Sequence, residues 1–404
     1  MLGQIKKVWR FLSYFFLAKE KTWRWPRQSD VLIFDASGQE VLLEYLRPWN
    51  PEVLHVRGEQ VNVRVLFASF FRGGRKFDAY VDSFIEAVHP RLIVTFIHNS
   101  INFYSISKRH PEIRTIFIQN GVQSYHLNVI DLLDERKPPR DALRVDYMMT
   151  FGACSGALYS RYMEGAVVPI GSLKSNLYPK GHSKRPGTIA FLSQYRNPKE
   201  FMLKGKLWTS QEFFGPTDRL VLKFLLEYSK KYGKEFFIVP CTGYLKDNTL
   251  KKEREYYNEL LGQSCRFSEW SWPGSSYDAA DSAEIIVGID STLGYESAAR
   301  GNKTAIFSIR TRLFDLPDRA FGWPETYPDD GPFWTNRPDP TAFERILDHL
   351  FAINESQWQA ELSESGFADL LAYDPGNTIL QSVLRKELGP TPIARDELEA
   401  VIYT

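Results

Sequence analysis

Two series of short apolar runs, separated by amphipathic stretches, dominate the chain from residue 30 onward. Runs rich in β-branched and aromatic residues are typical of strands buried on both faces, and the stretches between them are typical of helices. The alternation therefore predicts parallel sheets covered by helices. In the first series we expect a strand at 31–35 followed by a Gly-containing turn, further strands at 52–58, 91–99, 113–121 and 145–152, a helix at 76–89, and a closing segment at 167–176.

The second series begins after residues 174–187, which are rich in Ser, Pro, Gly, Lys and Asn and predict an interdomain linker. We expect strands at 188–196, 235–241, 284–290 and 303–309, and helices at 217–233, 276–283 and 291–301. A chain of 404 residues exceeds the size at which one core usually stops growing. We therefore predict an α/β protein with two Rossmann-like domains facing a central cleft, divided into an N-terminal helix at 1–29, a first domain at 30–180, a second domain at 181–375, and a C-terminal helix and tail at 376–404.

The charge balance and the missing motifs exclude several classes of protein. A net charge of +1, from 50 Lys and Arg against 49 Asp and Glu, removes any whole-protein argument for nucleic-acid binding. Cys154, Cys241 and Cys265 form no CxxC pair, so neither a zinc site nor a disulfide framework is predicted, and a reducing cytosol fits. The phosphate-loop, HExxH, GxSxG and GxGxxG motifs are absent, so we expect no metal and no bound cofactor.

The first 27 residues combine basic side chains with bulky apolar ones. Their apolar run of about ten residues is shorter than the roughly twenty that a membrane-spanning helix needs, and no small-residue cleavage site follows it. Such a segment is typical of a helix that lies in the headgroup layer of an anionic membrane. A first helix docked on the protein is the alternative, and the sequence leaves both open.

The strongest site signal is the turn from Asp290 to Glu296, where an apolar strand stops and a helix begins. Open α/β sheets bind ligands at the carboxyl ends of their strands, and unpaired N–H groups at a helix start favour phosphate. Ser291 and Thr292 add hydroxyl donors there, and Gly294 lets a ligand approach the backbone. We expect Glu296 on the helix surface to accept hydrogen bonds from a ribose. The alternative is an ordinary Ser N-cap followed by a Glu that favours the helix dipole.

Two further turns of the second series carry polar side chains. Ser193, Gln194 and Arg196 follow its first strand and are assigned to the same nucleotide, with Arg196 reaching a phosphate or a carboxylate. An Arg in a surface loop is the alternative. Asn336 and Arg337 are assigned to the sugar and acceptor side, although a plain turn before the helix expected near residue 340 is equally compatible.

Polar residues also follow three strands of the first series, and we expect them to line the opposite edge of the cleft. The turns begin at Asp35, His98 and Gln119. The residues assigned to the sugar and acceptor side are Ser37, Asn99, Gln119, Asn120 and Gly121.

Several blocks of the sequence resemble the bacterial surface-carbohydrate biosynthesis proteins of capsule and lipopolysaccharide synthesis, a family of GT-B type glycosyltransferases related to Kdo and polysialic acid transferases. These blocks lie at 31–38, 95–106, 115–126, 289–310 and 331–339, and the basic aromatic N-terminus is similar too. In order along the chain, they cover most of it. The resemblance implies a metal-independent GT-B transferase in which Ser291, Thr292 and Glu296 hold the nucleotide and the Asn120–Gly121 turn lines the sugar and acceptor side.

The resemblance also implies substrates and a place of action. The donor is expected to be a nucleotide sugar, with a CMP-activated ulosonic acid such as Kdo or a nonulosonic acid as the specific expectation. The acceptor is expected to be a capsule or O-antigen glycan, either free or lipid-linked, at the inner face of the cytoplasmic membrane. A UDP-sugar 2-epimerase, a CDP-polyol phosphotransferase and an inactive membrane-associated assembly scaffold are the alternatives.

Glycosyl transfer needs a group that removes the acceptor's proton or manages charge on the same face of the sugar. Asp35, Glu59 and His98 are the titratable candidates in the first domain. For Asp35 the alternative is a carboxylate that caps a turn, and for His98 it is a buried, hydrogen-bonded histidine.

Overall fold

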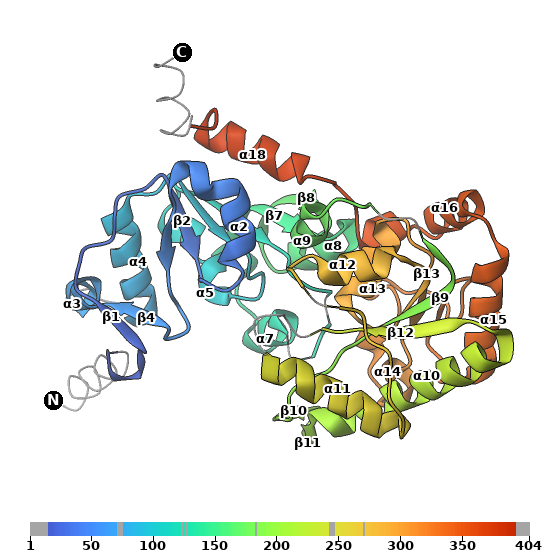
Figure 1. Ribbon diagram of the computed structural model, residues 1–404. Helices are drawn as coiled ribbons and strands as arrows, with labels where there is room; N and C mark the ends of the chain where they lie inside the picture. Colours follow the sequence, from blue (N-terminus) through green and yellow to red (C-terminus); the bar gives the residue numbers. More distant parts are fainter. Residues whose placement is uncertain are drawn as a thin grey trace, which may run out of the picture.

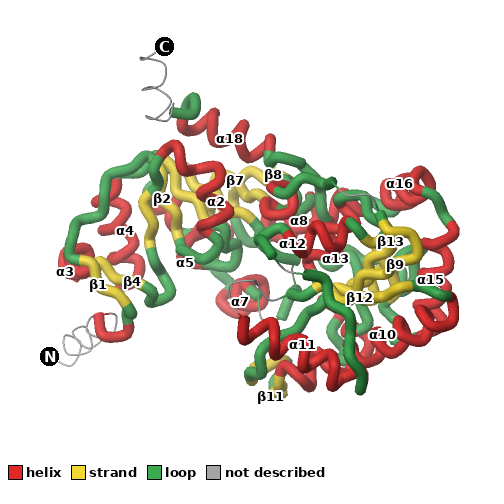
Figure 2. Tube along the Cα trace, viewed as in Figure 1, coloured by secondary structure: helices red, strands yellow, loops and turns green. Residues whose placement is uncertain are grey.

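The computed structural model describes residues 15–70, 76–122, 124–126, 128–181, 184–241, 247–269 and 271–392. Two α/β halves lie side by side, the first at the left of Figure 1 and the second at the right. Figure 2 shows the strands of each half gathered into a sheet between helices. Of the predicted N-terminal helix at 1–29, residues 1–14 lie outside the described residues. The rest of the prediction is wrong beyond residue 17, because Glu20–Thr22 form the strand β1. Within the described part of the chain, no helix has the length and apolar character needed to cross a membrane.

The first half holds a six-stranded parallel sheet in the order β3-β2-β5-β6-β7-β8. The five strands predicted for the first series are confirmed, and the segment expected to close the series contains the second half of the sixth strand. Their bounds are β2 (Val31–Phe34), β3 (Glu52–Leu54), β5 (Leu92–Thr95), β6 (Arg114–Ile118), β7 (Arg144–Thr150) and β8 (Glu164–Pro169).

Both faces of this sheet are buried, which explains its continuous apolar runs. Val31 and Ile33 of β2 pack into one cluster, whereas Leu32 and Phe34 pack into another on the opposite face. Side chains alternate between faces along a strand, so a helix layer is needed on each side. The helices of this half are α2 (Gln39–Leu46), α3 (Val63–Phe70), α4 (Lys76–Val88), α5 (Ile101–Tyr104), α6 (Ile106–Arg109), α7 (Val129–Arg136), α8 (Ala153–Ser160) and α9 (Leu173–Leu177), with 3₁₀ turns η1 (Arg47–Trp49) and η2 (Arg140–Ala142).

The second half holds a five-stranded parallel sheet in the order β12-β9-β13-β14-β15. The four strands predicted for the second series are confirmed, and β15 is a short addition at the edge. Their bounds are β9 (Arg185–Leu192), β12 (Glu235–Val239), β13 (Ala283–Gly288), β14 (Thr304–Phe307) and β15 (Trp334–Thr335).

Helices again cover both faces of the second sheet (Figure 1). The longest, α10 (Ser210–Tyr232), begins earlier than predicted because Thr209 and Glu212 form a capping box, and it ends at Gly233 in the left-handed conformation. The other helices are α11 (Asp247–Leu261), α12 (Ser275–Asp281), α13 (Thr292–Ala299), α14 (Arg310–Leu313), η3 (Pro317–Arg319), α15 (Pro340–Ala352), α16 (Glu355–Glu364) and α17 (Phe367–Leu370).

Each half also contains a small two-stranded sheet. In the first half β1 (Glu20–Thr22) pairs in parallel with β4 (Gln60–Asn62). In the second half β10 (Glu200–Leu203) and β11 (Lys206–Thr209) form an antiparallel hairpin just before α10. Neither pair was expected from the sequence, because three- and four-residue strands are too short to show a periodic pattern.

The linker predicted at 174–187 is wrong in part. α9 occupies its start, because the Ser172 hydroxyl caps that helix by accepting a hydrogen bond from the Ser175 N–H at 3.3 Å. β9 already begins at Arg185. Residues 178–184 alone therefore join the two halves at this crossing.

The C-terminal helix α18 (Thr378–Leu388) returns to the first half (Figure 1). Its buried side chains Leu380, Leu384 and Leu388 pack in the same cluster as Val31 and Ile33 of β2. The chain thus crosses between the halves twice, and its last described helix completes a helix layer of the first sheet.

A buried arginine ties the halves together. Arg300, at the end of α13, is 3% exposed and pairs with Asp281 of α12. Its Nη1 also donates to the carbonyl oxygens of Ser175 at 2.8 Å and Tyr178 at 2.9 Å, which belong to α9 and the first crossing. The charge is therefore balanced and hydrogen-bonded, which makes its burial tolerable.

We predict that Arg300→Ala lowers the free energy of unfolding by roughly 3–5 kcal/mol, because it leaves Asp281 charged and buried without its partner. Urea unfolding followed by circular dichroism measures the change. Arg219→Ala, on the exposed side of α10, is the matched control and should change stability by less than about 0.5 kcal/mol. If Arg300→Ala lowers the free energy of unfolding by less than about 1 kcal/mol, Arg300 does not hold the two halves together as described.

Candidate functional site

The strand order of the second sheet creates a crevice at its carboxyl edge. After β9 the chain adds β12 on one side, and it then crosses to add β13 on the other side. Helices that follow strands on the two sides of such a switch point cover opposite faces, so the strand ends there are left open to ligands. Ser193 follows β9 and Ser291 lies shortly after β13, so both flank this crevice.

A pocket of about 220 Å³ lies at the switch point and takes residues from both halves. The first half supplies Asn120, after β6, and Lys174 of α9. The second half supplies the ends of β9 and β12 and the starts of α12 and α13: Ser193, Val239, Pro240, Cys241, Ser276, Tyr277, Ser291, Thr292, Leu293 and Glu296.

Hydrogen-bond donors and positive charge dominate one wall of this interdomain pocket. Ser291 precedes α13 in an extended conformation, and its hydroxyl makes no capping hydrogen bond. The first N–H groups of a helix have no partner within it and carry its positive dipole end. Lys174 adds a half-buried ammonium group from the other half. This wall can therefore hold a phosphate or another anion.

Glu296 lies elsewhere than predicted. It was expected on the surface of α13, but it is 5% exposed and faces the first half. Its carboxylate accepts hydrogen bonds from the hydroxyls of Ser172, in the first half, and Tyr277 at 3.0 Å. Burial raises its pKa, against the hydrogen bonds of these two hydroxyls. Glu296 still lines the pocket, so its role toward a ribose stays a prediction.

Thr292 and Gly294 hold the structure of the pocket together. The Thr292 Oγ1 accepts a hydrogen bond at 3.1 Å from the N–H of Val122, in the first half. A side chain on Gly121 would point to the same oxygen, 3.6 Å away. Gly294 packs against Gly288 of β13, where an added Cβ would lie 3.8 Å from the Gly288 Cα. Small residues here bring α13 close to its own strand.

The three predicted residues after β9 have different surroundings. Ser193 lines the pocket, but its hydroxyl is shared with Glu253 and, at 3.0 Å, with the hydroxyl of Tyr257. Gln194 is buried, and Arg196 is exposed with its guanidinium 6.0 Å from the ring of Phe214. The structure therefore brings Ser193 together with Ser291, whereas Gln194 and Arg196 lie outside the pocket lining.

A buried charge network, which was not predicted from the sequence, lies beneath this crevice. Arg310 is fully buried and donates to Asp290, to Gln194 at 2.5 Å and to Thr217 at 3.0 Å. Burial opposes the charge on Asp290, but the guanidinium groups of Arg310 and Arg319 outweigh it and keep its pKa low. Asp290 is therefore a charged anchor for the turn that leads to Ser291.

Asp35 and His98 lie at the corresponding switch point of the first sheet, after β2 and β5. Asp35 is buried; its carboxylate accepts from the N–H of Ser37 at 3.0 Å and pairs with the Nε of Arg57 at 2.7 Å. Glu59 accepts a hydrogen bond from the N–H of Arg57. Neither carboxylate lines the interdomain pocket.

His98 supports the turn that reaches the pocket. It is 5% exposed, and its Nδ1 accepts a hydrogen bond at 3.1 Å from the N–H of Asn120. Burial lowers its pKa to about 4, so the ring stays neutral at neutral pH with its proton on Nε2. Asn99, directly after it, is exposed.

Gln119 and the two predicted residues near β15 have structural partners. Gln119 is buried, donates to the carbonyl oxygen of Gly121 at 2.9 Å and accepts from the N–H of Phe151 at 2.8 Å. Asn336 is 2% exposed and accepts from the N–H of Phe321, while Arg337 pairs with Asp330 at 3.1 Å. None of these three predicted residues lines the interdomain pocket.

A His–Asp pair across the two halves was also missed. His126, six positions after Asn120, directs its Nδ1 to Asp318 of η3 at 3.0 Å. The other carboxylate oxygen of Asp318 accepts from the N–H groups of Tyr125 and His126, at 2.9 and 3.1 Å. A carboxylate can only accept, so Nδ1 carries a proton, and in the neutral ring the lone pair is on Nε2. The sequence places the two residues far apart, and only the fold brings them together.

Within the described ranges, no three His, Cys, Asp or Glu side chains are grouped so that they could hold a metal ion.

We predict that the stability of the protein relative to a Glu296→Gln variant falls as pH rises from about 4.5. The folded-state pKa of Glu296 lies above its unfolded value, so the folded protein binds more protons in this window and loses stability as the carboxyl ionises. Urea unfolding of both proteins between pH 4.5 and 8 measures the difference. Parallel curves over the whole range would show that Glu296 titrates normally.

The comparisons with known proteins agree with this architecture. In a structure soaked with CDPG, the wall teichoic acid polymerase TagF matches 96% of this chain and 98% of its own, with 12% identity and a TM-score of 0.51. MnaA from S. aureus, in a structure with UDP, matches 93% of this chain and 100% of its own, with 10% identity and a TM-score of 0.50. Such likeness shows the fold, which is that of the GT-B glycosyltransferases. No curated protein sequence matches the chain significantly.

A family model described as "putative O-antigen biosynthesis protein" matches residues 116–388, two thirds of the chain. The match runs from β6 through both crossings to the end of α18, and so includes every residue that lines the interdomain pocket. The chain belongs to this family of O-antigen biosynthesis proteins.

Proposed function

We propose that the protein is a glycosyltransferase of bacterial surface-glycan synthesis that binds a nucleotide-activated donor in the interdomain pocket. The observation that carries the proposal is the pocket at the β9/β13 switch point, where the start of α13, the Ser291 hydroxyl and Lys174 meet. Ligands of doubly wound sheets bind at such points, and a diphosphate or phosphate linkage supplies the anion that this wall favours.

The proposed donor roles follow from these positions. Ser291 and the α13 N–H groups bind the phosphate, and Lys174 neutralises it from the other half. Glu296 and Thr292 shape the nucleoside side, since both already bridge the two halves. Ser193 and Asn120 border the same space. Gln194 is proposed to act on the donor indirectly, through its hydrogen bond to Asp290. Arg196, which is exposed, is proposed to act at the mouth of the crevice.

We extend the proposal to the nucleobase and the sugar of the donor. The specific donor expected from the sequence is a CMP-activated ulosonic acid. The structures of TagF and MnaA carry CDPG and UDP, so cytidine and uridine donors both belong in the first test. A thermal-shift screen of CMP, CDP, UDP, GDP and TDP sugars identifies the base, because a bound donor stabilises the folded state by mass action. Analysis of products with and without an acceptor then separates a transferase from an epimerase, which needs no acceptor.

We predict that Lys174→Met weakens binding of the preferred nucleotide about tenfold, the equivalent of ~1.4 kcal/mol, because a half-buried charge opposite the phosphate is lost. Isothermal titration calorimetry measures the affinity. Lys199→Met, an exposed lysine outside the pocket lining, is the matched control and should bind as the unchanged protein does. Equal affinities for the two variants would remove Lys174 from the donor site.

For the transfer step we propose His126 as the group that takes the proton of the acceptor hydroxyl. The acceptor oxygen forms a bond to the donor's anomeric carbon as the bond to the nucleotide phosphate breaks. The acceptor's proton moves to the His126 Nε2, and the departing nucleotide keeps the bonding electrons beside Lys174 and α13. Asp318 holds the required tautomer and stabilises the ring once it is charged. Asp35, Glu59 and His98 remain proposals for the same role, although all three have hydrogen-bond partners elsewhere.

We predict that His126→Gln lowers kcat about a hundredfold or more while nucleotide affinity stays unchanged, because the base is removed from the side of the acceptor. Turnover is measured with the donor found in the screen. His110→Gln is the matched control, since His110 also pairs with an aspartate, Asp82, but both residues of that pair lie in the first half instead of joining the two halves. A fully active His126→Gln variant would return the role to Asp35.

The acceptor and the membrane complete the proposal. A glycan of the O-antigen or capsule type, either free or lipid-linked, is proposed to enter from the first half, at the edge where Ser37, Asn99 and Asn120 lie. Residues 16–27 expose Phe16, Trp23 and Trp25 beside several lysines and arginines. Such a surface suits the headgroup layer of an anionic membrane, so we propose action at the inner face of the cytoplasmic membrane.

A further inference from the structure

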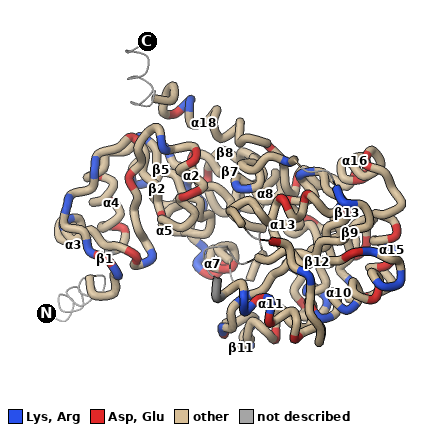
Figure 3. The backbone as a smooth tube through the Cα atoms, viewed as in Figure 1, with Lys and Arg blue, Asp and Glu red and all other residues tan. Residues whose placement is uncertain are grey.

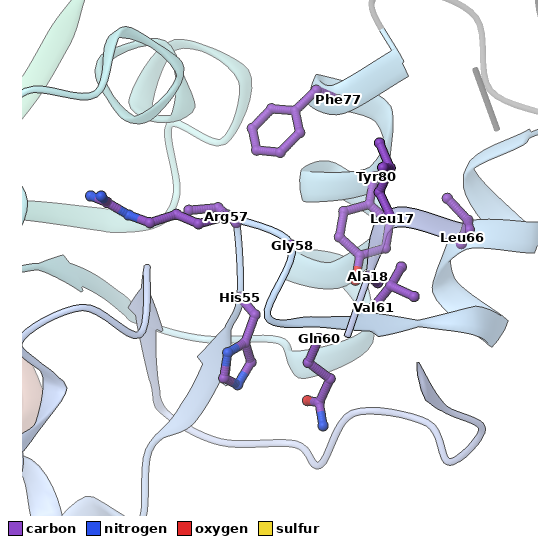
Figure 4. A pocket seen from close by; sticks show the side chains of 11 residues that line it. Leu17, Ala18, His55, Arg57, Gly58, Gln60, Val61, Leu66, Phe77 and Tyr80 are labelled. Atoms are coloured by element: carbon purple, nitrogen blue, oxygen red, sulfur yellow. The ribbon is translucent and has the colours of Figure 1, made fainter. Parts of the chain in front are cut away.

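A second pocket lies in the first half, apart from the interdomain pocket, and nothing proposed above occupies it. Its volume is about 340 Å³, within the range of roughly 300–1,000 Å³ that is usual for pockets that bind small molecules. Figure 4 shows it between the segment before β1, the β3–β4 loop, α3 and α4. The apolar side chains that wall it are Ala18, Val56, Val61, Leu66, Phe77 and Tyr80.

The walls suit a hydrocarbon chain. The polar atom among those six side chains, the Tyr80 hydroxyl, already accepts a hydrogen bond at 3.0 Å from the N–H of Asn62. Burial raises the pKa of Tyr80 to about 12, so the group stays neutral. Each methylene moved from water into such surroundings contributes about 0.8 kcal/mol.

Charge and unpaired polar atoms gather at one end of the pocket. Arg57 lines it, and in Figure 4 its guanidinium group points away from the apolar walls. Its Nε binds Asp35, while its two terminal nitrogens donate to no other described residue, and half of the side chain is exposed. The Nδ1 of His55, which also lines the pocket, is buried without a hydrogen-bond partner. These groups suit an anionic head attached to an apolar chain.

The position of Arg57 also determines how a ligand would be oriented in the pocket. Because it is bound to Asp35 at the end of β2, a head group held by its free nitrogens lies at the carboxyl edge of the first sheet. That edge carries the residues proposed for the acceptor. A ligand with its chain in the pocket therefore presents its head toward the transfer site.

The surface beside the pocket indicates where such a ligand comes from. Leu17 lines the pocket and is 77% exposed, and Phe16 next to it is 71% exposed. The following strand β1 pairs with β4 and carries Lys21, and Figure 3 shows basic positions along this edge. Exposed apolar groups with neighbouring cations match the interface of an anionic lipid layer rather than water.

We propose that this pocket binds the hydrocarbon chain of a lipid-linked acceptor, with Arg57 on the phosphate that joins the chain to its glycan. The acceptor role rests on the proposed function, whereas binding of a lipid phosphate does not. The occupant is thus a single amphiphile, an isoprenoid or alkyl phosphate.

Farnesyl phosphate, farnesol and inorganic phosphate are the probes, and calorimetry below the micellar concentration measures their binding to the full chain. Farnesyl phosphate should bind at least tenfold more tightly than farnesol, and an excess of inorganic phosphate should not displace it. Arg57→Gln should remove the preference for farnesyl phosphate and leave farnesol binding unchanged. Arg64→Gln, an exposed arginine on α3 outside the pocket lining, is the matched control and should keep the preference.

Leu66→Trp, which fills the pocket, should abolish binding of both lipids. If its melting temperature falls, Ala18→Leu fills the pocket instead from the segment before β1. Unchanged farnesyl phosphate binding by a folded, filled variant overturns the proposal. So does adsorption to anionic vesicles by a protein that binds no monomeric farnesyl phosphate, because it would identify a membrane surface instead.

The nucleotide screen keeps the two proposals apart. A protein that binds farnesyl phosphate but no nucleotide has the lipid pocket and lacks the proposed transferase function. A protein that binds a nucleotide sugar but no farnesyl phosphate has the donor site and lacks the lipid pocket.

Discussion

The buried contact of Arg300 with Asp281 and with the carbonyl groups of α9 is the interaction on which the arrangement of the two halves depends. It fixes α9 against α13, and this in turn places Ser172 on Glu296 and Lys174 beside the start of α13. Each half alone has only part of the lining of the interdomain pocket. The chemistry proposed for the pocket therefore requires Arg300, a charged residue that does not line the pocket.

Most of the fold could be predicted from the sequence, because buried parallel strands leave long apolar runs that only this architecture explains. Each of the strands β2, β5, β6, β7, β9, β12, β13 and β14 overlaps an expected segment, although β7, β9 and β13 begin one to three residues before theirs. The start of α10 and the helix within the linker were missed, since single capping residues, Thr209 and Ser172, decided them. The two small sheets left no periodic signal at all.

The part of the candidate site that could be predicted is the part whose position follows from where the strands end. The position of Ser291 follows from where β13 stops, and so does that of Ser193 after β9. Whether a polar side chain faces the pocket or the interior depends on its partners. Gln194, Gln119 and Asn336 are occupied by contacts distant in the sequence. Glu296 was expected at the surface because a helix of eight residues shows too little periodicity to reveal that both of its sides are covered. The pairs Arg310–Asp290 and His126–Asp318 join residues that no spacing rule connects.

The second crossing of the chain has a mechanical consequence. Residues 372–377 return to the first half directly beside the first crossing, where the N–H of Gly376 donates to the carbonyl oxygen of Asn176 at 2.8 Å and the N–H of Asp374 to its side chain at 3.2 Å. The two segments that connect the halves therefore lie next to each other and contact each other at Asn176. Because the two crossing segments are hydrogen-bonded to each other at Asn176, we expect any relative motion of the halves to be a rotation about this point and not a sliding of one half past the other.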